Sequence, residues 1–271
     1  MSRERLFAGQ ITDGLIVETD GHTGWITFND PGRHNAVSFD MWAAIPAALK
    51  HFEDNADIRS VVLTGAGEKA FVSGANISQF EALRTGATAV EEYEVVAEQA
   101  QLSLHNFSKP IIARIDGYCI GGGLNIALCC DIRLASDASV FSIPAARLGL
   151  GYRYTAIQNL VRAAGTANAL EIFITAARYR AQQALDRGLV HAVCEKAKLD
   201  DLVGGYLGQI NANAPLTMAV GKKMIKLLAD RDARIDPDQM KALVLQCFES
   251  EDYKEGKAAF AQKRPPVFKG R

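Results

Sequence analysis

A strand, three consecutive glycines and an apolar helix follow one another within IIARIDGYCIGGGLNIALCCDIRLA, residues 111–135. The apolar run Ile111–Ile115 predicts a buried strand, and Leu124–Cys130, apolar nearly all round, predicts a buried helix. The glycines between them, Gly121–Gly123, allow a sharp turn and leave amide N–H groups unobstructed. At a helix N-terminus such groups lack intrahelical partners and favour a phosphate, a carboxylate or a developing oxyanion. The segment therefore predicts an α/β fold in which the glycines form either an anion site or a tight packing turn.

A second glycine-containing loop lies in FVSGANISQF, Phe71–Phe80. Gly74 and Ala75 follow a strand-like segment there and precede a predicted helix start at Asn76 or Ser78. Two such loops can aim two N–H groups at one oxygen, which is how an enzyme stabilises the enolate of a thioester.

The remaining pattern predicts strands and helices in alternation, followed by a helical C-terminal third. Leu15–Thr19 and Trp25–Phe28 flank a glycine-containing turn and predict a hairpin, and Ser38 is a predicted N-cap for a helix that reaches Phe52. Further strands are expected at Val61–Thr64, Ile132–Ala135, Val140–Ser142 and Val190–Val193, and further helices at about 87–107, 156–163, 166–176, 181–187, 199–211, 215–229, 236–248 and 251–261.

Composition restricts the class of protein. The chain has 271 residues, of which 48% are hydrophobic and 23% charged, as in ordinary folded proteins. Its 30 basic and 31 acidic residues provide no net basic field for nucleic acid or an anionic membrane, so neither is an expected partner. No apolar run is long enough to span a membrane. The five cysteines contain no CxxC pair and no metal-ligand spacing, which indicates reduced thiols and no metal. The N-terminal MSRERLFAGQ is charged and has no apolar signal-peptide core, so a cytoplasmic protein is expected.

The two glycine loops at this spacing resemble the crotonase (enoyl-CoA hydratase/isomerase) superfamily, and the likeness extends to the C-terminal SEDYKEGKAAFAQKRPPVFKGR, Ser250–Arg271. The resemblance implies an α/β fold built as a spiral of ββα units. It also implies a core over residues 1–200 and a helical oligomerisation region over 201–271, in a homotrimer or a dimer of trimers. The implied substrate is an acyl-CoA thioester. No further cofactor is implied, since coenzyme A enters as part of the substrate.

The resemblance also assigns site residues, motif by motif. The oxyanion amides correspond to Ala75 and Gly122. Residues implied to bind coenzyme A lie in the loop PGRHNAVS, in the second glycine loop and near the C-terminus: Arg33, Asn35, Ala36, Gly74, Asn76, Ile77, Phe260 and Lys263. Phe260 and Lys263 correspond to groups that reach coenzyme A on an adjoining subunit. For the cations among them, a solvated surface charge is the alternative interpretation.

The sequence departs from the family at the residues that handle protons. Hydratases of the family use one glutamate three residues after the oxyanion glycine and another just after the proline of the next loop, and here these positions hold Asn125 and Ala145. Neither an amide nor a methyl group can act as a general acid or base. Asn76 also stands where many relatives carry Asp. Ordinary two-glutamate hydration is therefore in doubt.

The loop PAARLGLGYRYTAIQNL, Pro144–Leu160, offers the nearest replacements. Tyr152 and Tyr154 lie beside Arg147 and Arg153, and positive charge would lower a phenol pKa enough for acid–base work. The alternative is that both tyrosines pack as amphipathic loop anchors. The nearest carboxylate in the sequence, Glu81, is expected on a solvated helical face.

These observations predict an enoyl-CoA hydratase/isomerase-type enzyme that stabilises an enolate without both usual glutamates. Two alternatives stay open: a decarboxylase of malonyl-type CoA esters, which forms the enolate without removing a proton, and a non-catalytic acyl-CoA-binding homologue. A nucleotide-binding oxidoreductase is suggested only by Gly65–Ala70, a G-x-G-x-x-A run. A Rossmann unit needs a second strand ending in an acidic residue about 20 residues further on, and the sequence there has no apolar run.

Overall fold

The computed structural model describes residues 3–6, 12–76, 87–230 and 234–271. Within them the larger sheet has seven strands, in the spatial order β1 (Glu4–Leu6), β2 (Leu15–Asp20), β3 (Thr23–Phe28), β4 (Ser60–Gly65), β6 (Ile111–Ile115), β8 (Ile132–Ser136) and β11 (Ala192–Cys194). β1, β2 and β3 pair antiparallel, and every later pairing is parallel. The predicted hairpin is β2–β3, and Gly21 in its turn has a φ of 55°.

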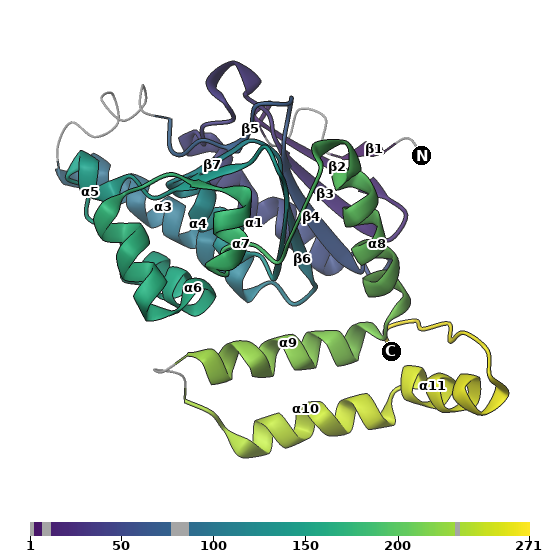
Figure 1. The fold of residues 1–271 in the computed structure, drawn as a ribbon. Helices are drawn as coiled ribbons and strands as arrows, with labels where there is room; N and C mark the ends of the chain where they lie inside the picture. The colour runs from purple at the N-terminus through teal and green to yellow at the C-terminus, as the bar shows by residue number, and fades with distance from the viewer. Residues whose placement is uncertain (1–2, 7–11, 77–86, 231–233) are drawn as a thin grey trace.

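A smaller sheet lies beside the first (Figure 1). Its strands, in spatial order, are β10 (Tyr179–Arg180), β9 (Val140–Ser142), β7 (Tyr118–Ile120) and β5 (Ala70–Val72). β4, β6 and β8 of the larger sheet are each followed in sequence by β5, β7 and β9 of the smaller one. This repetition is the spiral of ββα units, and the predicted fold class is confirmed. The run Gly65–Ala70 leads directly into β5, so it does not open the helix that a Rossmann site requires.

Helices cover both sheets and form the C-terminal third. They are α1 (Phe39–Asp54), α3 (Ala87–Asn106), α4 (Gly122–Cys129), α5 (Ala145–Leu148), α6 (Tyr154–Thr175), α7 (Ala181–Asp186), α8 (Leu199–Ala212), α9 (Pro215–Ala229), α10 (Pro237–Glu249) and α11 (Glu251–Gln262), with 3₁₀ turns at Pro31–Arg33 and Lys196–Lys198. Of the helices in the described ranges, none combines the length and apolar character needed to cross a membrane.

Two apolar clusters hold the fold together. The main one joins both sheets to α1, α3 and α4, and every residue of α4 from Gly123 to Cys129 is buried, as its all-round apolar sequence predicts. The second lies on the other face of the larger sheet, where Trp25, Val62 and Ile112 meet α8 through Leu199. Thus α8, which the predicted division at residue 200 assigns almost wholly to the C-terminal region, covers the core sheet.

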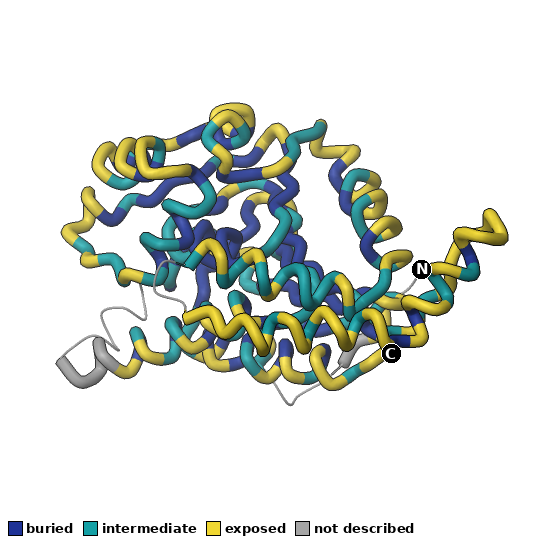
Figure 2. The backbone as a smooth tube through the Cα atoms, turned by 90° about the horizontal axis from the view of Figure 1, so that it is seen from below, coloured by how far each residue is buried: buried dark blue, intermediate teal, exposed yellow. Residues whose placement is uncertain are grey.

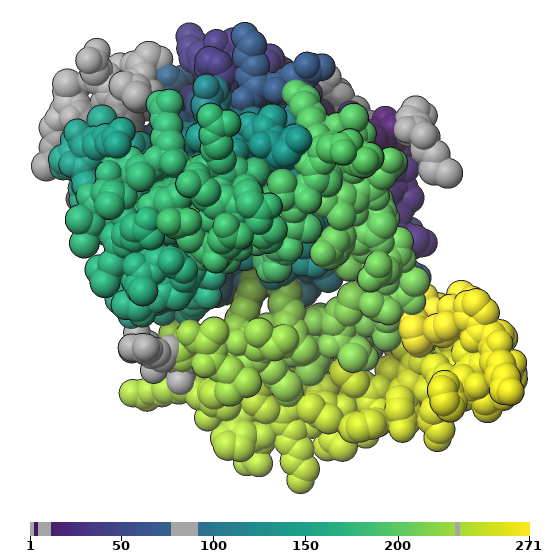
Figure 3. Space-filling model, in the orientation of Figure 1, coloured from purple at the N-terminus to yellow at the C-terminus, as the bar shows by residue number. Residues whose placement is uncertain are grey.

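The last three helices form a layer of their own beneath the two sheets (Figure 1). Buried residues gather in the two-sheet body, whereas α9 and α10 have none (Figure 2). A hollow separates this layer from the body (Figure 3). Two lysines of α9 cross it to Asp131 at the start of β8, with Nζ–carboxylate distances of 2.6 Å for Lys222 and 3.1 Å for Lys226. Burial lowers the pKa of Lys222 to about 8, although Asp131 opposes this shift.

Two expectations about element positions need correction. The strand predicted at Val190–Val193 is β11, which begins two residues later. The helices predicted at 156–163 and 166–176 form α6, with non-helical torsions at Gly165 (φ 71°, ψ 162°) marking a kink between them. The helix start predicted at Asn76 or Ser78 stays a prediction, because residues 77–86 lie outside the described ranges.

Gly123 allows α4 to begin directly against β5. A Cβ at this position would lie 2.1 Å from the carbonyl oxygen of Val72, closer than any real contact. We expect Gly123→Ala to lower the free energy of unfolding by about 1–3 kcal/mol, measured by urea denaturation. Gly204→Ala in the exposed part of α8 is the control, since no neighbouring atom lies within 4 Å of its Cβ. This variant should be unchanged or up to about 1 kcal/mol more stable, and equal midpoints for both variants would refute the close approach.

Candidate active site

Two loops from neighbouring strands meet at one edge of the smaller sheet. β5 leads into Gly74–Ala75, and β7 leads into Gly121–Gly122. Because β5 and β7 pair directly and in parallel, both loops leave the sheet at the same edge. A Cβ built on Gly122 would lie 3.7 Å from the backbone nitrogen of Ala75. The two loops singled out in the sequence are therefore adjacent in space.

The backbone N–H groups of these loops remain available to a ligand. The N–H of Val37 donates to the oxygen of Gly74 at 2.8 Å, and the N–H of Asn76 donates to the oxygen of Val37 at 3.0 Å. The intervening N–H of Ala75 therefore points away from Val37. Gly122 is the first residue of α4, where an N–H has no intrahelical partner. Within the described part of the chain, neither of these two N–H groups donates to another backbone group.

A cavity of about 410 Å³ opens at these amides. α1 contributes Trp42 to its wall, α3 contributes Tyr93 and Glu94, and the segment before α6 contributes Tyr152 and Arg153. The indole Nε1 of Trp42 donates to the hydroxyl of Tyr93 at 2.9 Å, which ties α1 to α3 across the cavity wall. A mostly apolar cavity with a few placed polar groups is suited to a small organic ligand.

Comparison with known proteins identifies the family of the chain. The family profile described as enoyl-CoA hydratase/isomerase matches residues 18–271. The chain belongs to the enoyl-CoA hydratase/isomerase family. Membership in this family, part of the crotonase superfamily, confirms the resemblance seen in the glycine loops. The chain is accordingly a hydratase/isomerase-type enzyme that processes acyl-CoA.

Individual relatives cover nearly the whole chain. A short-chain-enoyl-CoA hydratase from Clostridium acetobutylicum is 32% identical over 256 residues, which span 93% of this chain and 96% of that protein. A peroxisomal Delta(3,5)-Delta(2,4)-dienoyl-CoA isomerase from Arabidopsis thaliana is 31% identical over 92% of this chain and 94% of that protein. The crystal structure of an enoyl-CoA hydratase/carnithine racemase from Magnetospirillum magneticum matches with a TM-score of 0.92 and 33% identity, over 96% of this chain and 97% of that one.

Asn125 and Ala145, which the resemblance matches to the glutamates of family hydratases, both line the cavity and are buried. Asn125 lies one turn into α4, and its side chain is close enough to Tyr152 to oppose the rise in the pKa of that phenol. The Oδ1 atom of Asn125 has no hydrogen-bond partner among the described residues. A buried acceptor without a partner is costly unless a ligand or water supplies a donor. This part of the wall thus offers a hydrogen-bond acceptor and no carboxylate.

The two tyrosines do not behave as the sequence predicted. Tyr152 lines the cavity, but burial raises the pKa of its phenol above the usual value, with Glu94 adding to the rise and the side chain of Asn125 opposing it. The expectation of a lowered pKa is therefore wrong. The side chain of Tyr154 is 67% exposed, and this residue is not among those that line the cavity. Burial thus keeps the phenol of Tyr152 neutral, and the guanidinium of Arg153 bonds to Glu94 and Glu98 of α3 instead.

Sequence reasoning missed a carboxylate cluster on α3. The Nε atom of Arg153 donates to Oε2 of Glu94 at 2.8 Å, and Nη1 donates to Oε2 of Glu98. Glu94 lines the cavity, whereas Glu98, one helical turn along α3, is not among the lining residues. The i, i+4 spacing of these glutamates was visible in the predicted helix 87–107. Which face of that helix meets the cavity is a tertiary property. The earlier candidate carboxylate, Glu81, lies outside the described residues.

In the loop predicted to hold the adenosine and pantetheine arm, Arg33 is exposed and lies 3.4 Å from Asp30. Asn35 is fully buried, and its side-chain amide donates to the backbone oxygens of Ala66 and Ala70 at 2.9 and 2.8 Å. The side chain of Asn35 therefore fixes the loop to β5 and is not available to a ligand. The assignment of Asn35 to the coenzyme A site, which rests on the family resemblance, stays a prediction.

The other predicted coenzyme A residues are more scattered. Ala36 and Asn76 are buried, Gly74 lines the cavity, and Ile77 lies outside the described residues. Phe260, 88% exposed, and Lys263 lie at the C-terminal end of α11, which is remote from the cavity walls in Figure 1. The chain by itself does not bring these last two residues to its own cavity.

Replacing Tyr152 by Phe tests the corrected assignment. Because the buried phenol is neutral near pH 7, we expect Tyr152→Phe to lower kcat by less than about tenfold, whereas loss of a general base costs about 10²–10⁴-fold. The rate of acyl-CoA turnover as a function of pH should keep its shape. A loss above a hundredfold, together with disappearance of a limb of the pH profile, would restore the phenol as the proton-transfer group.

Proposed function

We propose that the protein forms the enolate of an acyl-CoA thioester whose carbonyl oxygen is held by the amides of Ala75 and Gly122. The observation that carries this proposal is the meeting of two loops whose N–H groups have no backbone acceptor and which line one cavity. Negative charge develops on the thioester oxygen when the enolate forms, so donors aimed at that oxygen stabilise the transition state more than the substrate. The N-terminus of α4 adds the positive end of its dipole.

The cavity supports proton transfer better than water addition. Hydration requires a group to activate water and a group to protonate carbon, and neither Asn125 nor Ala145 can do either. An isomerase needs only to remove a proton from one carbon and return it to another. The matched relatives include hydratases and an isomerase by name, so both reactions occur on related chains. We assign the isomerase type of chemistry to this chain.

The charges around the cavity argue against a decarboxylase. A malonyl-type ester would bring its own carboxylate into the cavity, where a cation would have to receive it. Arg153 is the only basic residue among the described lining residues, and it already bonds to Glu94 and Glu98. Two carboxylates and one guanidinium leave a net charge of −1, which repels another anion. A non-catalytic binder would account for the missing glutamates, but it would not need two backbone N–H groups without a backbone acceptor beside the cavity.

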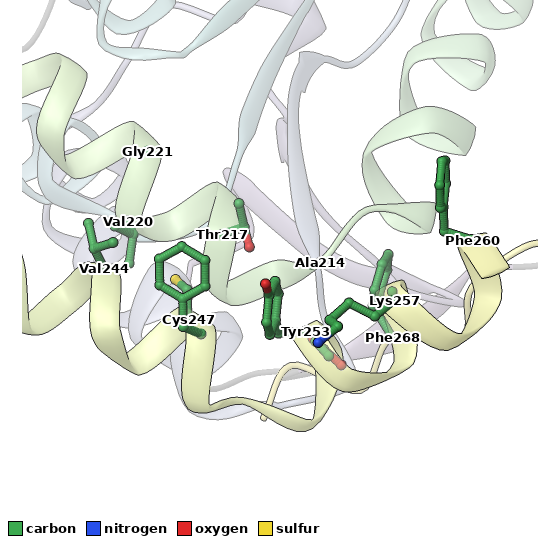
Figure 4. Close-up of a pocket in the computed structure, with 13 residues that line it drawn as sticks. Ala214, Thr217, Val220, Gly221, Val244, Cys247, Tyr253, Lys257, Phe260 and Phe268 are labelled. Carbon is green, nitrogen blue, oxygen red and sulfur yellow. The ribbon is translucent and has the colours of Figure 1, made fainter.

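The coenzyme A arm and the oligomer are part of the same proposal. In this proposal exposed Arg33 meets a phosphate of coenzyme A, and Phe260 and Lys263 reach coenzyme A on a neighbouring subunit. We propose a homotrimer or a dimer of trimers joined through the C-terminal helices. Apolar surface on these helices supports the oligomer. A groove between α9 and the α10–α11 segment is lined by Val220, Val244 and other apolar side chains (Figure 4), and Ile225, Leu228 and Phe248 are exposed.

Gly122→Pro removes one proposed donor without adding charge. Proline is tolerated at the first position of a helix, so α4 should persist. We expect kcat to fall by about 10²–10³-fold, assayed on a panel of enoyl-, 3-hydroxyacyl- and malonyl-type CoA esters. Gly122→Ala keeps the N–H, and its Cβ would make ordinary contacts at 3.5 Å to Trp42 and 3.7 Å to the nitrogen of Ala75. Equal turnover by the proline variant and the parent would show that this amide is not used.

The charge of the cavity predicts a preference for neutral acyl groups. At one position methylmalonyl-CoA carries a carboxylate where isobutyryl-CoA carries a methyl group. Because the Glu94–Arg153–Glu98 cluster is net negative, we expect the Kd of methylmalonyl-CoA to be at least roughly tenfold higher than that of isobutyryl-CoA, which is about 1.4 kcal/mol of binding free energy. Calorimetry measures both values. It should also release no carbon dioxide. Tighter binding of methylmalonyl-CoA with release of carbon dioxide would favour the decarboxylase.

A further inference from the structure

Glu94 is the only carboxylate among the described residues that line the cavity. We propose that Glu94 removes and returns the substrate proton, in place of the two glutamates missing at Asn125 and Ala145. This inference rests on the proposed function, because a base at Glu94 is useful only if a thioester is held at the amides of Ala75 and Gly122. It assigns the chemistry to α3, an element that carries none of the residues transferred from the family.

Arg153 holds the Glu94 carboxylate at the cavity wall. Its Nε–H donates to Oε2 of Glu94 at 2.8 Å, and the same guanidinium bonds to Glu98. A long side chain fixed by such a bond loses less freedom when it meets a substrate. One guanidinium shared between two carboxylates leaves the cluster with a net negative charge. Glu94 therefore remains a charged acceptor for a proton.

The surroundings of Glu94 favour a single proton carrier. Its side chain is 32% exposed, so a ligand in the cavity can reach it. Tyr152 faces the same cavity and is close enough for the charge of Glu94 to raise the pKa of its phenol. With that phenol neutral, Glu94 is the one group among the described lining residues that can accept a proton near pH 7.

The reaction that a single carboxylate performs is a 1,3-proton shift. Glu94 takes a proton from C2 of a 3-enoyl thioester: the C2–H bond breaks, an O–H bond forms on the carboxylate, and the electron pair moves into the thioester carbonyl. The resulting dienolate oxygen is held by Ala75 and Gly122. C4 then takes the proton from Glu94, and the electron pair returns to give the conjugated 2-enoyl ester. No water is consumed, and the substrate class is a neutral 3-enoyl-CoA.

Exchange of the C2 hydrogens of butyryl-CoA in D₂O isolates the first half of this reaction, because a saturated ester cannot isomerise. We expect the wild-type protein to catalyse exchange, followed by NMR. Glu94→Gln should slow exchange by about 10²–10⁴-fold while its Kd for butyryl-CoA, from calorimetry, stays near the wild-type value. Glu98→Gln is the matched control. Glu98 bonds to the same guanidinium but does not line the cavity, so exchange by this variant should stay within about tenfold of wild type.

Arg153→Gln separates a positioning role of the guanidinium from a structural one. Among the described residues, the titratable and charged groups that share the cavity with Glu94 or bond to its partner are Arg153, Glu98, Tyr93 and Tyr152. Without the bond from Nε the carboxylate of Glu94 is no longer held at the wall, so the exchange rate should fall while the Kd for butyryl-CoA stays near the wild-type value, and Arg153→Lys should recover part of the rate. A purely structural role would weaken binding as well, and Arg153→Lys would not recover the exchange rate.

Three results would overturn the assignment. They are wild-type exchange by Glu94→Gln, butyryl-CoA binding by the wild-type protein without any exchange, and a loss in Glu98→Gln as large as that in Glu94→Gln. Failure of the wild-type protein to bind butyryl-CoA would have a different meaning, since it would refute the proposed function on which this role depends. Binding and exchange are measured on the same samples, so the two failures are distinguishable.

Discussion

Parallel pairing of β5 with β7 is the contact on which the site depends. It sets two glycine loops side by side, so that Ala75 and Gly122 can face one cavity. The pairing is irregular between Ala70 and Val72, and it is crowded, because α4 begins where Gly123 almost touches the carbonyl of Val72. Because these donors are backbone N–H groups, they do not depend on the identity of any side chain. The side chains of the cavity wall can therefore be substituted while the donors remain.

Such a change is visible in the distribution of carboxylates. Asn125 and Ala145 contribute no carboxylate to the cavity wall, while Glu94 brings one to the cavity from α3. Arg153 accompanies it and is neutralised by two partners. The cavity thus has acceptors on one side and amide donors on the other. This arrangement suits a neutral acyl group whose carbonyl gains negative charge during the reaction.

Local sequence signals predicted the fold well, because strands and glycine turns depend on short-range pattern. The apolar run Ile111–Ile115, the glycines that open α4 and the helical C-terminal third all appear where expected. Side-chain partners between distant segments were not predictable. Arg153 lies next to Tyr152 in the sequence, yet it bonds to glutamates 55 and 59 residues away. In the same way, nothing near Asn35 in the sequence shows that its side chain bonds to Ala66 and Ala70.

The most direct measurement is a crystal structure of the protein with a bound acyl-CoA. The proposed oxyanion pocket predicts the thioester oxygen at about 2.7–3.1 Å from the backbone nitrogens of both Ala75 and Gly122, with the acyl chain in the cavity beside α3. A thioester oxygen that meets only one of these nitrogens, or an acyl chain bound elsewhere, would contradict it.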